Sequence, residues 1–489
     1  MPNVGKPSRG CQPCKDRKVK CDQGLPECRR CRRNSRLCSG YPTATDLIFR
    51  NTLSVDVDEH RRQQPLPTTI SSRRTSSIGA PMPADWHAQS VCMFFHDYVI
   101  KPSDDKVCFG FLHGLPDLLS KEHGTSAFEE AVSAVALISF AHRSSLEYLV
   151  PQARRRYGRA LSLIAEALRK QENLKEDPVL ATILCLGYYE LVSGEKLASP
   201  CALWSSHVDV LESLLRMRRP EQVESSSSTY LSFNAHNTLT IRNLTRKIRP
   251  SKEAEFMGRD PRRDPYSRQF GGLACETCHL LADADDLLRQ AAIDYVQVTA
   301  LHEIIDAIII LDMKLTTWSG QASGYYLFAK MEAPLSAPPK TAFDLQAPPS
   351  IHLYTSPTMA AMWNQYRCMR ILLLECLQKC SSRQREYTAW EPTPLKIDNP
   401  CAVDQISQGI EDLIDDICAS VSYLLGEVDQ EGNLRQPQQK KAIGGFLLLW
   451  PLRLIVCKGL GTLLQRNWMM KRLGYIRNVL GIYEATSLS

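Results

Sequence analysis

The chain has 489 residues, which is too long for one small module and enough for two to four domains. Apolar residues make up 44% of it, enough to bury a sizeable core, and the formal net charge is +6. No uninterrupted apolar run reaches the roughly 18 residues of a membrane-spanning helix, and residues 1–10 contain no apolar stretch of the kind found in secretory signals. These features argue against a membrane or secreted protein and predict a reducing environment.

Six cysteines near the N-terminus form a repeat of two similar halves. Within each half, two and then six residues separate successive cysteines, and the second half follows at an offset of 17 residues. Structural zinc takes four ligands, so each half alone is one thiolate short. Two zinc ions need eight coordination positions, which six sulfurs fill if two of them bridge both ions. The repeat therefore predicts a binuclear zinc cluster with one bridge from each half, and leaves open which cysteines bridge. The predicted ligands are Cys11, Cys14, Cys21, Cys28, Cys31 and Cys38.

A disulfide framework is the alternative interpretation of six cysteines in a short segment, because small secreted domains use them in this way. A chain without an export signal stays where thiols are reduced and bind metal. The sequence therefore favours zinc.

Positive charge is confined to the same segment. Residues 1–38 hold 11 Lys or Arg and 3 Asp or Glu, a net of +8, so the rest of the chain sums to −2. Six thiolates and two Zn²⁺ ions together add about −2, which leaves a strongly basic surface. Such a surface predicts double-stranded DNA as the partner. A solvated surface and a nuclear-import signal are the alternatives for a basic run of this kind.

The segment resembles the fungal six-cysteine, two-zinc binuclear cluster family of transcription factors. The six cysteines carry this resemblance together with the basic stretch Lys15–Lys20 and with Pro26. The resemblance implies that Cys11 and Cys28 bridge the two zinc ions and that Pro26 shapes the loop joining the halves. It also implies a nuclear regulator of RNA polymerase II transcription that controls a metabolic gene cluster and is not an enzyme.

Family members place the C-terminal end of their first short helix in the major groove of DNA. The resemblance implies that Lys18 is the main base reader, with Arg17 beside it, and that the targets are GC-rich, CGG-like triplets. A lysine donor suits the adjacent O6 and N7 acceptors of guanine. Lys15 and Lys20 are expected to contact phosphates, which position the protein without specifying the sequence.

Four segments are expected along the chain. Residues 1–9 form a flexible arm, residues 10–40 the zinc cluster domain, residues 41–85 a mostly disordered linker, and residues 86–489 a large all-α domain. Many family members carry a heptad coiled coil just after the cluster. No sustained heptad pattern occurs between residues 39 and 84, so the sequence does not favour a zipper dimer and leaves the oligomeric state open.

Apolar residues recur at helical spacing from Trp86 onward, and strand-like alternation is scarce. The chain near Pro451 is expected to form a buried helix that bends or breaks at the proline. The Ser-, Pro- and charge-rich stretches 219–270 and 319–350 are expected to be loops or partly disordered insertions. The clearest helices are expected at 179–193, 201–218, 271–291, 293–317, 357–380, 402–426 and 441–465.

Three pieces of this part resemble the fungal-specific transcription factor domain that accompanies such clusters. They are Leu184–Gly194, Trp363–Arg367 and Gly444–Pro451, and they occur in the family's order. The resemblance implies a regulatory domain, with coactivators or a small-molecule effector as further partners.

Other motifs invite a chemical interpretation but have structural alternatives. The segment Cys275–His279 offers only three local metal ligands, whereas structural zinc needs four. His302–Asp306 nearly matches the helix motif of zinc proteases, but Asp306 stands in place of the second histidine. Acidic patches at residues 283–286 and 411–416 could contact coactivators or form solvated helix faces. No catalytic constellation is found, in agreement with a protein that is not an enzyme.

Overall fold

The structure is a computed structural model that divides into two units, Met1–Ala80 and Pro81–Ser489, each of which is described by itself. The expected arm and nearly all of the expected linker lie outside the described residues. The described residues are 11, 13–14, 17, 19–22, 24, 28–34, 38, 85–102, 110–122, 126–170, 176–194, 206–217, 226–290, 295–332, 348–388, 400–435 and 441–486.

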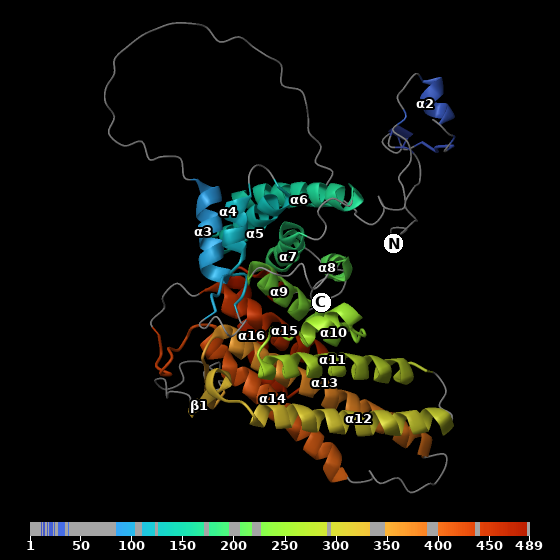
Figure 1. Cartoon of the computed structure of the whole chain (residues 1–489), viewed down its shortest axis with the longest axis vertical. Coiled ribbons are helices and arrows are strands. Elements are labelled where there is room, and N and C mark those ends of the chain that lie inside the picture. The colour runs from blue at the N-terminus through green and yellow to red at the C-terminus, as the bar shows by residue number, and fades with distance from the viewer. Residues whose placement is uncertain are drawn as a thin grey trace. The chain divides into compact units, whose positions relative to one another are not determined.

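The second unit is helical over most of its described length (Figure 1), which confirms the predicted all-α architecture. One antiparallel pair of short strands, β1 and β2, interrupts the helices, with Lys330 opposite His352. Its elements are α3 (Trp86–Tyr98), α4 (Leu115–Lys121), α5 (Ala127–Arg143), η2 (Glu147–Leu149), α6 (Val150–Lys170), α7 (Asp177–Ser193), α8 (Ser206–Met217), α9 (Ser226–Arg246), α10 (Lys252–Gly258), α11 (Pro265–Leu288), α12 (Tyr295–Gly320), η4 (Gly324–Tyr326), β1 (Phe328–Glu332), β2 (Ser350–Tyr354), α13 (Pro357–Thr388), α14 (Pro400–Leu424), α15 (Ala442–Lys458), α16 (Leu463–Asn478) and η6 (Tyr483–Thr486).

Helix α5 is the centre of the N-terminal half of this unit and packs against α3, α6 and α7. It begins at a cap, where the hydroxyl of Ser126 accepts a hydrogen bond from the backbone N–H of Glu129 (3.1 Å). Most of its side chains are buried, from Phe128 to Ala141. A helix that is apolar on nearly all sides must be enclosed by other helices. The sequence of α5 therefore accounts for its central position.

Helix α13 has the same role in the C-terminal half, where it packs against α11, α12, α14 and α15. Side chains of its Trp363–Arg367 motif form hydrogen bonds to the neighbouring elements. The indole N–H of Trp363 donates to the Tyr326 carbonyl in η4 (2.9 Å), and the Asn364 amide donates to the Ser420 hydroxyl in α14 (2.9 Å). Buried polar groups are stable when they find such partners. The motif thus joins three parts of the domain.

The described part of the stretch 219–270, residues 226–270, is mostly helical, so the prediction of a loop is wrong there. It contains α9, α10 and the beginning of α11, and many polar side chains of α9 are buried. Arg242 is 3% exposed and forms ion pairs with Asp209 (2.7 Å) and Glu212 (2.6 Å) of α8. Residues that suggest a surface loop in the sequence are here paired inside the fold, so their polarity gave a misleading signal.

Helix α15 is buried, as expected, and it runs through Pro451 without a break. It continues to Lys458 and ends at Gly459, whose φ of +66° lies in the left-handed region. Glycine adopts this conformation without the steric cost that other residues incur. The expected helix 441–465 is therefore two helices, α15 and α16, and Thr462 begins the second with a capping box that it forms with Gln465.

The C-terminal turn η6 is fastened to α15 by a buried ion pair. Arg453 and Glu484 are 2% and 1% exposed, and a guanidinium nitrogen lies 3.1 Å from the carboxylate. Removing one partner of such a pair would leave an uncompensated charge in the core. The described C-terminal segment is thus part of the folded core. None of the helices in the described part of the chain is both long and apolar enough to cross a membrane.

The stability of the helical unit is expected to fall as the pH drops from about 6.5 towards 3, because two histidines are buried in neutral form. Burial and the neighbouring Arg367 lower the pKa of His352 to about 3, and burial and Arg263 do the same for His236. Below pH 6.5 these two histidines bind protons in the unfolded chain but stay neutral in the folded chain, so acid favours unfolding. Each histidine contributes about 1.4 kcal/mol per pH unit.

Urea unfolding of the full chain between pH 7.5 and 5 checks this slope. His352→Gln removes one of these titrating groups, so the slope should decrease by about one proton. An unchanged slope in that variant would show that His352 becomes protonated in the folded protein.

Candidate metal centre and nucleic-acid interface

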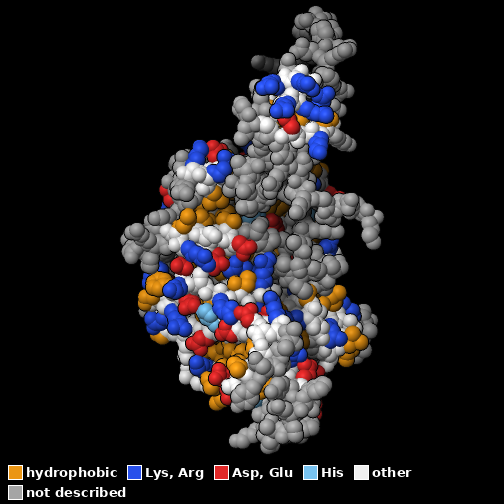
Figure 2. All heavy atoms as spheres, turned by 90° about the vertical axis from the view of Figure 1, so that its right-hand side faces the viewer, with side chains coloured by type: hydrophobic (Ala, Val, Ile, Leu, Met, Phe, Trp, Pro, Cys, Tyr) orange, Lys and Arg blue, Asp and Glu red, His pale blue; other side chains and the backbone are white. Residues whose placement is uncertain are grey.

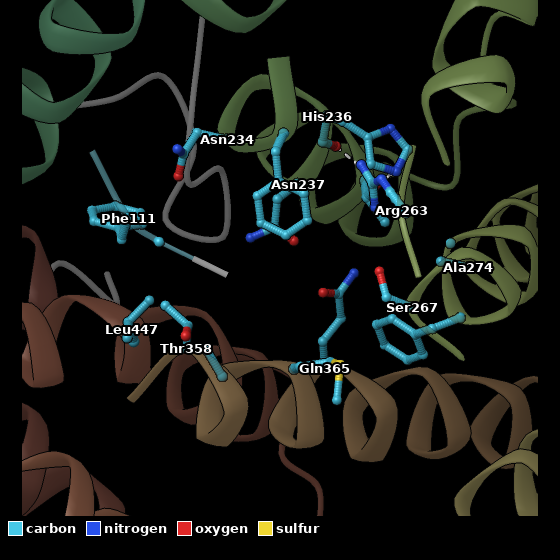
Figure 3. A pocket seen from close by; sticks show the side chains of 17 residues that line it. Phe111, Asn234, His236, Asn237, Arg263, Ser267, Ala274, Thr358, Gln365 and Leu447 are labelled. Atoms are coloured by element: carbon cyan, nitrogen blue, oxygen red, sulfur yellow. Dashed lines mark hydrogen bonds between the residues drawn. The ribbon is translucent and has the colours of Figure 1, made fainter. Parts of the chain in front are cut away.

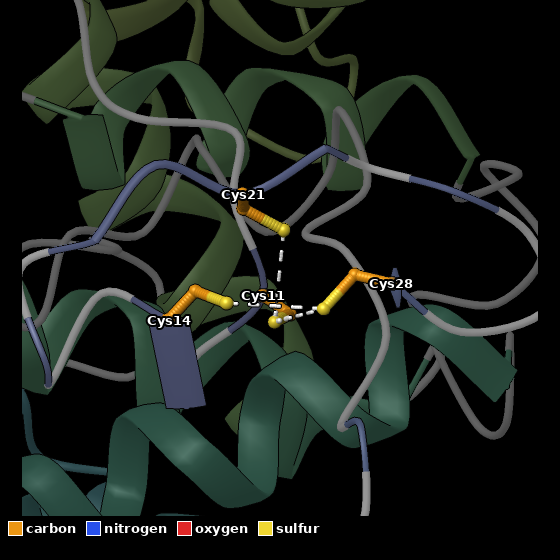
Figure 4. A group of neighbouring side chains, drawn as sticks. All are labelled: Cys11, Cys14, Cys21 and Cys28. Carbon is orange, nitrogen blue, oxygen red and sulfur yellow. Dashed lines mark hydrogen bonds between the residues drawn. The ribbon is translucent and has the colours of Figure 1, made fainter. Parts of the chain in front are cut away.

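The six N-terminal cysteines come together in the first unit. Their sulfurs form two groups of four, and within each group all sulfurs lie within 4.8 Å of one another. One group contains Cys14 and Cys21, the other contains Cys31 and Cys38, and both contain Cys11 and Cys28. Figure 4 shows the first group, with the four sulfurs directed towards a common centre. Because Cys11 and Cys28 belong to both groups, six sulfurs fill the eight coordination positions that two zinc ions need.

The sulfur separations fit zinc and exclude disulfides among these residues. The Sγ atoms of Cys11 and Cys28 are 3.7 Å apart, and those of Cys14 and Cys28 are 3.8 Å apart. A tetrahedral zinc ion with Zn–S bonds of about 2.3 Å places its sulfurs about 3.8 Å from one another. A disulfide would bring two sulfurs to about 2.05 Å. All six cysteines are free thiols in this structure, which argues against the disulfide alternative.

Without a cation this centre disfavours thiolates. Burial and the neighbouring thiols raise the pKa of Cys11 far above its usual range, and the hydrogen bond with Cys28 together with burial raises the pKa of Cys31 to about 12. Divalent zinc has the opposite effect, because a coordinating thiol is deprotonated outright. The donor set, its burial and its spacing thus fit two zinc ions.

Local backbone structure holds the second half of the cluster in place. Helix α2 (Arg29–Arg33) begins at Cys28, whose sulfur accepts a hydrogen bond from the backbone N–H of Cys31 (3.3 Å). The carboxylate of Asp22, in the first half, accepts a hydrogen bond from the backbone N–H of Arg29 (3.1 Å). A carboxylate at a helix N-terminus satisfies an otherwise unpaired donor. Asp22 therefore links the two halves, a role that cysteine spacing alone could not reveal.

The basic residues that the structure describes in this unit are exposed and do not belong to the sulfur centre. Arg17 and Lys20 are exposed, and so are all four arginines of α2. Figure 2 shows the result as a concentration of Lys and Arg side chains near the top of the view. Lys15 and Lys18, the other two predicted DNA contacts, lie outside the described residues, as does Pro26.

The other candidate metal motifs are accounted for by structure. Cys275 and Cys278 lie on the buried side of α11 and are 3% and 1% exposed, and His279 pairs with Glu255 (2.6 Å). Within the described ranges, metal-holding groups occur only among the N-terminal cysteines. His302 bonds to the carbonyl of its own helix at Val298 (2.8 Å). Two isoleucines further along the same helix, Ile309 and Ile310, are 41% and 54% exposed.

The acidic patches are largely paired within the chain. In the first, Arg249 forms ion pairs with Asp283 and Asp286, each at 2.7 Å. In the second, Asp416 pairs with Lys330 at 3.1 Å and lies near the buried Arg367. These contacts connect the segment between α9 and α10 to α11, and the small sheet to α14. Coactivator binding at either patch stays a prediction.

A sulfur centre built for two zinc ions, a basic surface around it and a separate helical unit together define a zinc-cluster regulator of transcription. Two family matches agree with this class: residues 9–47 match the Fungal Zn(2)-Cys(6) binuclear cluster domain, and residues 113–323 match the Fungal specific transcription factor domain. The chain belongs to the fungal zinc binuclear cluster transcription factors, and its cluster domain binds two zinc ions. This family is generally nuclear and is not an enzyme class.

Individual relatives support the same assignment. The chain is 23% identical over 412 residues to the transcription factor dbaG of Emericella nidulans, a match that covers 81% of this chain and 89% of that protein. It is 36% identical over 74 residues to the transcriptional regulatory protein moc3 of Schizosaccharomyces pombe, which covers 14% of this chain and 15% of that protein. No solved structure matches. The protein is thus a DNA-binding regulator of transcription.

Proposed function

We propose that the zinc cluster reads CGG-like triplets in the major groove of nuclear DNA and regulates RNA polymerase II transcription. The observation that carries this proposal is the set of exposed basic side chains on the segment whose six cysteines form a mostly buried sulfur cluster. Zinc fixes the fold of the short segment, and the protein's own arginines and lysines meet the phosphates.

Individual residues have different parts in this proposal. All six cysteines bind zinc, and Cys11 and Cys28 bridge the two ions, which is supported by their membership of both sulfur groups. Lys18 donates to guanine, with Arg17 beside it. Lys15 and Lys20 contact phosphates and set the register of the cluster on the duplex.

Lys18→Ala is expected to weaken binding to a CGG-containing duplex by about 1–3 kcal/mol and to flatten the preference among triplets, because a base-edge donor is lost. The matched control is Lys20→Ala. It should weaken binding to every duplex alike and reduce the dependence of affinity on salt by about one counterion. Fluorescence anisotropy across a salt series measures both effects. If Lys18→Ala kept the wild-type preference, another residue would be the base reader.

We also propose that the targets form a metabolic gene cluster, which is supported by the family resemblance. Genome-wide occupancy mapping gives the binding site, the half-site spacing and the target genes in one experiment. Occupied sites scattered among unrelated genes would contradict this part of the proposal without affecting the DNA-binding function.

A further inference from the structure

The space that a partner could fill lies on the outside of the helical unit. The interior hollow between α9, α11 and α13 (Figure 3) has a volume of only about 60 Å³, which is room for a few water molecules. A groove between α11 and α12, by contrast, has a volume of about 790 Å³ and is open to solvent. Grooves on protein surfaces commonly receive a helix that lays its apolar side chains into them. The outer surface of α11 and α12 is therefore shaped for docking.

Helix α12 has an apolar outer face beside this groove. The helix packs against α11 and α13, and its opposite side is exposed (Figure 1). Ile309, Ile310 and Met313 lie on that side and are 41%, 54% and 64% exposed. Ile310 and Met313 also line the groove. Large apolar side chains that cluster on a surface mark contacts with other proteins, and methionine adapts readily to a partner.

Charges of opposite sign lie towards the two ends of this face. Glu303 and Asp306 are exposed in the N-terminal half of α12, and neither forms an ion pair within the described part of the chain. The other end of the groove is basic, because Arg268 of α11 lines it and likewise has no ion-pair partner among the described residues. Lys314 lines it too, but its ammonium pairs with Glu276 (3.0 Å). Arg268 is thus the uncompensated cation of the groove.

These features are self-complementary under a twofold axis. An antiparallel pair of α12 helices with Ile310 at the axis would place Glu303 of one copy over Thr317 of the other, because both residues are seven positions from Ile310. Thr317 and Arg268 line the same groove, so Glu303 of the second copy would approach Arg268. The axis would repeat this pair on the other side of an apolar centre formed by Ile310 and Met313. Isologous contacts of this kind are the commonest in protein dimers.

We propose that the groove between α11 and α12 receives α12 of a second copy of the chain, in an antiparallel twofold dimer that pairs Glu303 with Arg268. The contact involves one helix and one groove per copy, an area at the small end of specific interfaces, so we expect a dissociation constant of about 1–10 μM. The dimer carries two zinc clusters and can engage two DNA half-sites at once. The contact itself goes beyond the proposed DNA-binding function and does not rest on it.

Sedimentation velocity of the full, zinc-loaded chain without DNA measures this association. The unaltered protein should be mainly dimeric at about 50 μM and should dissociate on dilution. Met313→Lys places a charge in the apolar centre and should raise the dissociation constant at least about tenfold. Met470→Lys makes the same change at an exposed position of α16 and should leave the constant unchanged. An unaltered protein that stays monomeric at the higher concentration, or equal constants for the two variants, would overturn the proposal.

Charge reversal tests the antiparallel register at two residues that have no described ion pair within one copy. Arg268→Glu and Glu303→Arg should each raise the dissociation constant about tenfold, because like charges then meet across the interface. The double variant exchanges the two signs and should recover an affinity within about threefold of the unaltered protein, since the pair is restored. Circular dichroism confirms that each variant is folded. A double variant that associates no better than the single variants would contradict the pairing of Glu303 with Arg268.

Discussion

Cys28→Ser is expected to remove both zinc ions and to abolish DNA binding, because its sulfur belongs to both groups of four. Cys38→Ser should remove only one ion, since Cys38 belongs to one group and the other keeps its four sulfurs. Zinc binding supplies roughly 10–16 kcal/mol to the folding of small zinc domains, so loss of both ions leaves this segment without a stable fold.

Metal analysis of the purified chain measures these outcomes directly. We expect two zinc ions in the unaltered protein, one in Cys38→Ser and none in Cys28→Ser. Cys92→Ser is the matched control, because Cys92 is an exposed thiol in the helical unit. It should keep both ions and full affinity for DNA. If Cys28→Ser and Cys38→Ser lost zinc equally, Cys28 would not be a bridging ligand.

Gly444→Ala is expected to destabilise the helical unit by more than about 4 kcal/mol, the range reached when a substitution disrupts the packing of a core. An added Cβ at this position of α15 would lie 1.7 Å from the carbonyl oxygen of Leu424, at the end of α14. Backbone cannot move away as a flexible side chain can, so the two helices would have to separate. Chemical denaturation of the full chain measures the loss.

The same substitution elsewhere should have the opposite sign. A Cβ at Gly474, within α16, would meet no atom within 4 Å. Gly474→Ala should therefore stabilise the unit by up to about 1 kcal/mol, because alanine favours helix and restricts the unfolded chain. A Gly444→Ala protein as stable as the wild type would contradict the close approach of α14 and α15.

The metal centre could be predicted from sequence because ligand number and spacing follow from zinc chemistry alone. The backbone contact of Asp22 with α2 could not, since it depends on how the loop between the two halves folds. The same contrast holds in the helical unit. Apolar periodicity predicts α7 and α13 well, but the polar residues of α9 look like a loop until α8 supplies Asp209 and Glu212 for Arg242.

The buried ion pair between Arg453 and Glu484 has a genetic consequence. A nonsense or frameshift allele that ends a few codons before Glu484 would still encode every helix from α3 to α16, but the buried guanidinium of Arg453 would lack the Glu484 carboxylate. Breaking a buried pair in this way costs about 3–5 kcal/mol, a large share of the stability of an ordinary domain. Late truncations should therefore behave as null alleles through loss of folded protein, even though the whole zinc cluster is still encoded.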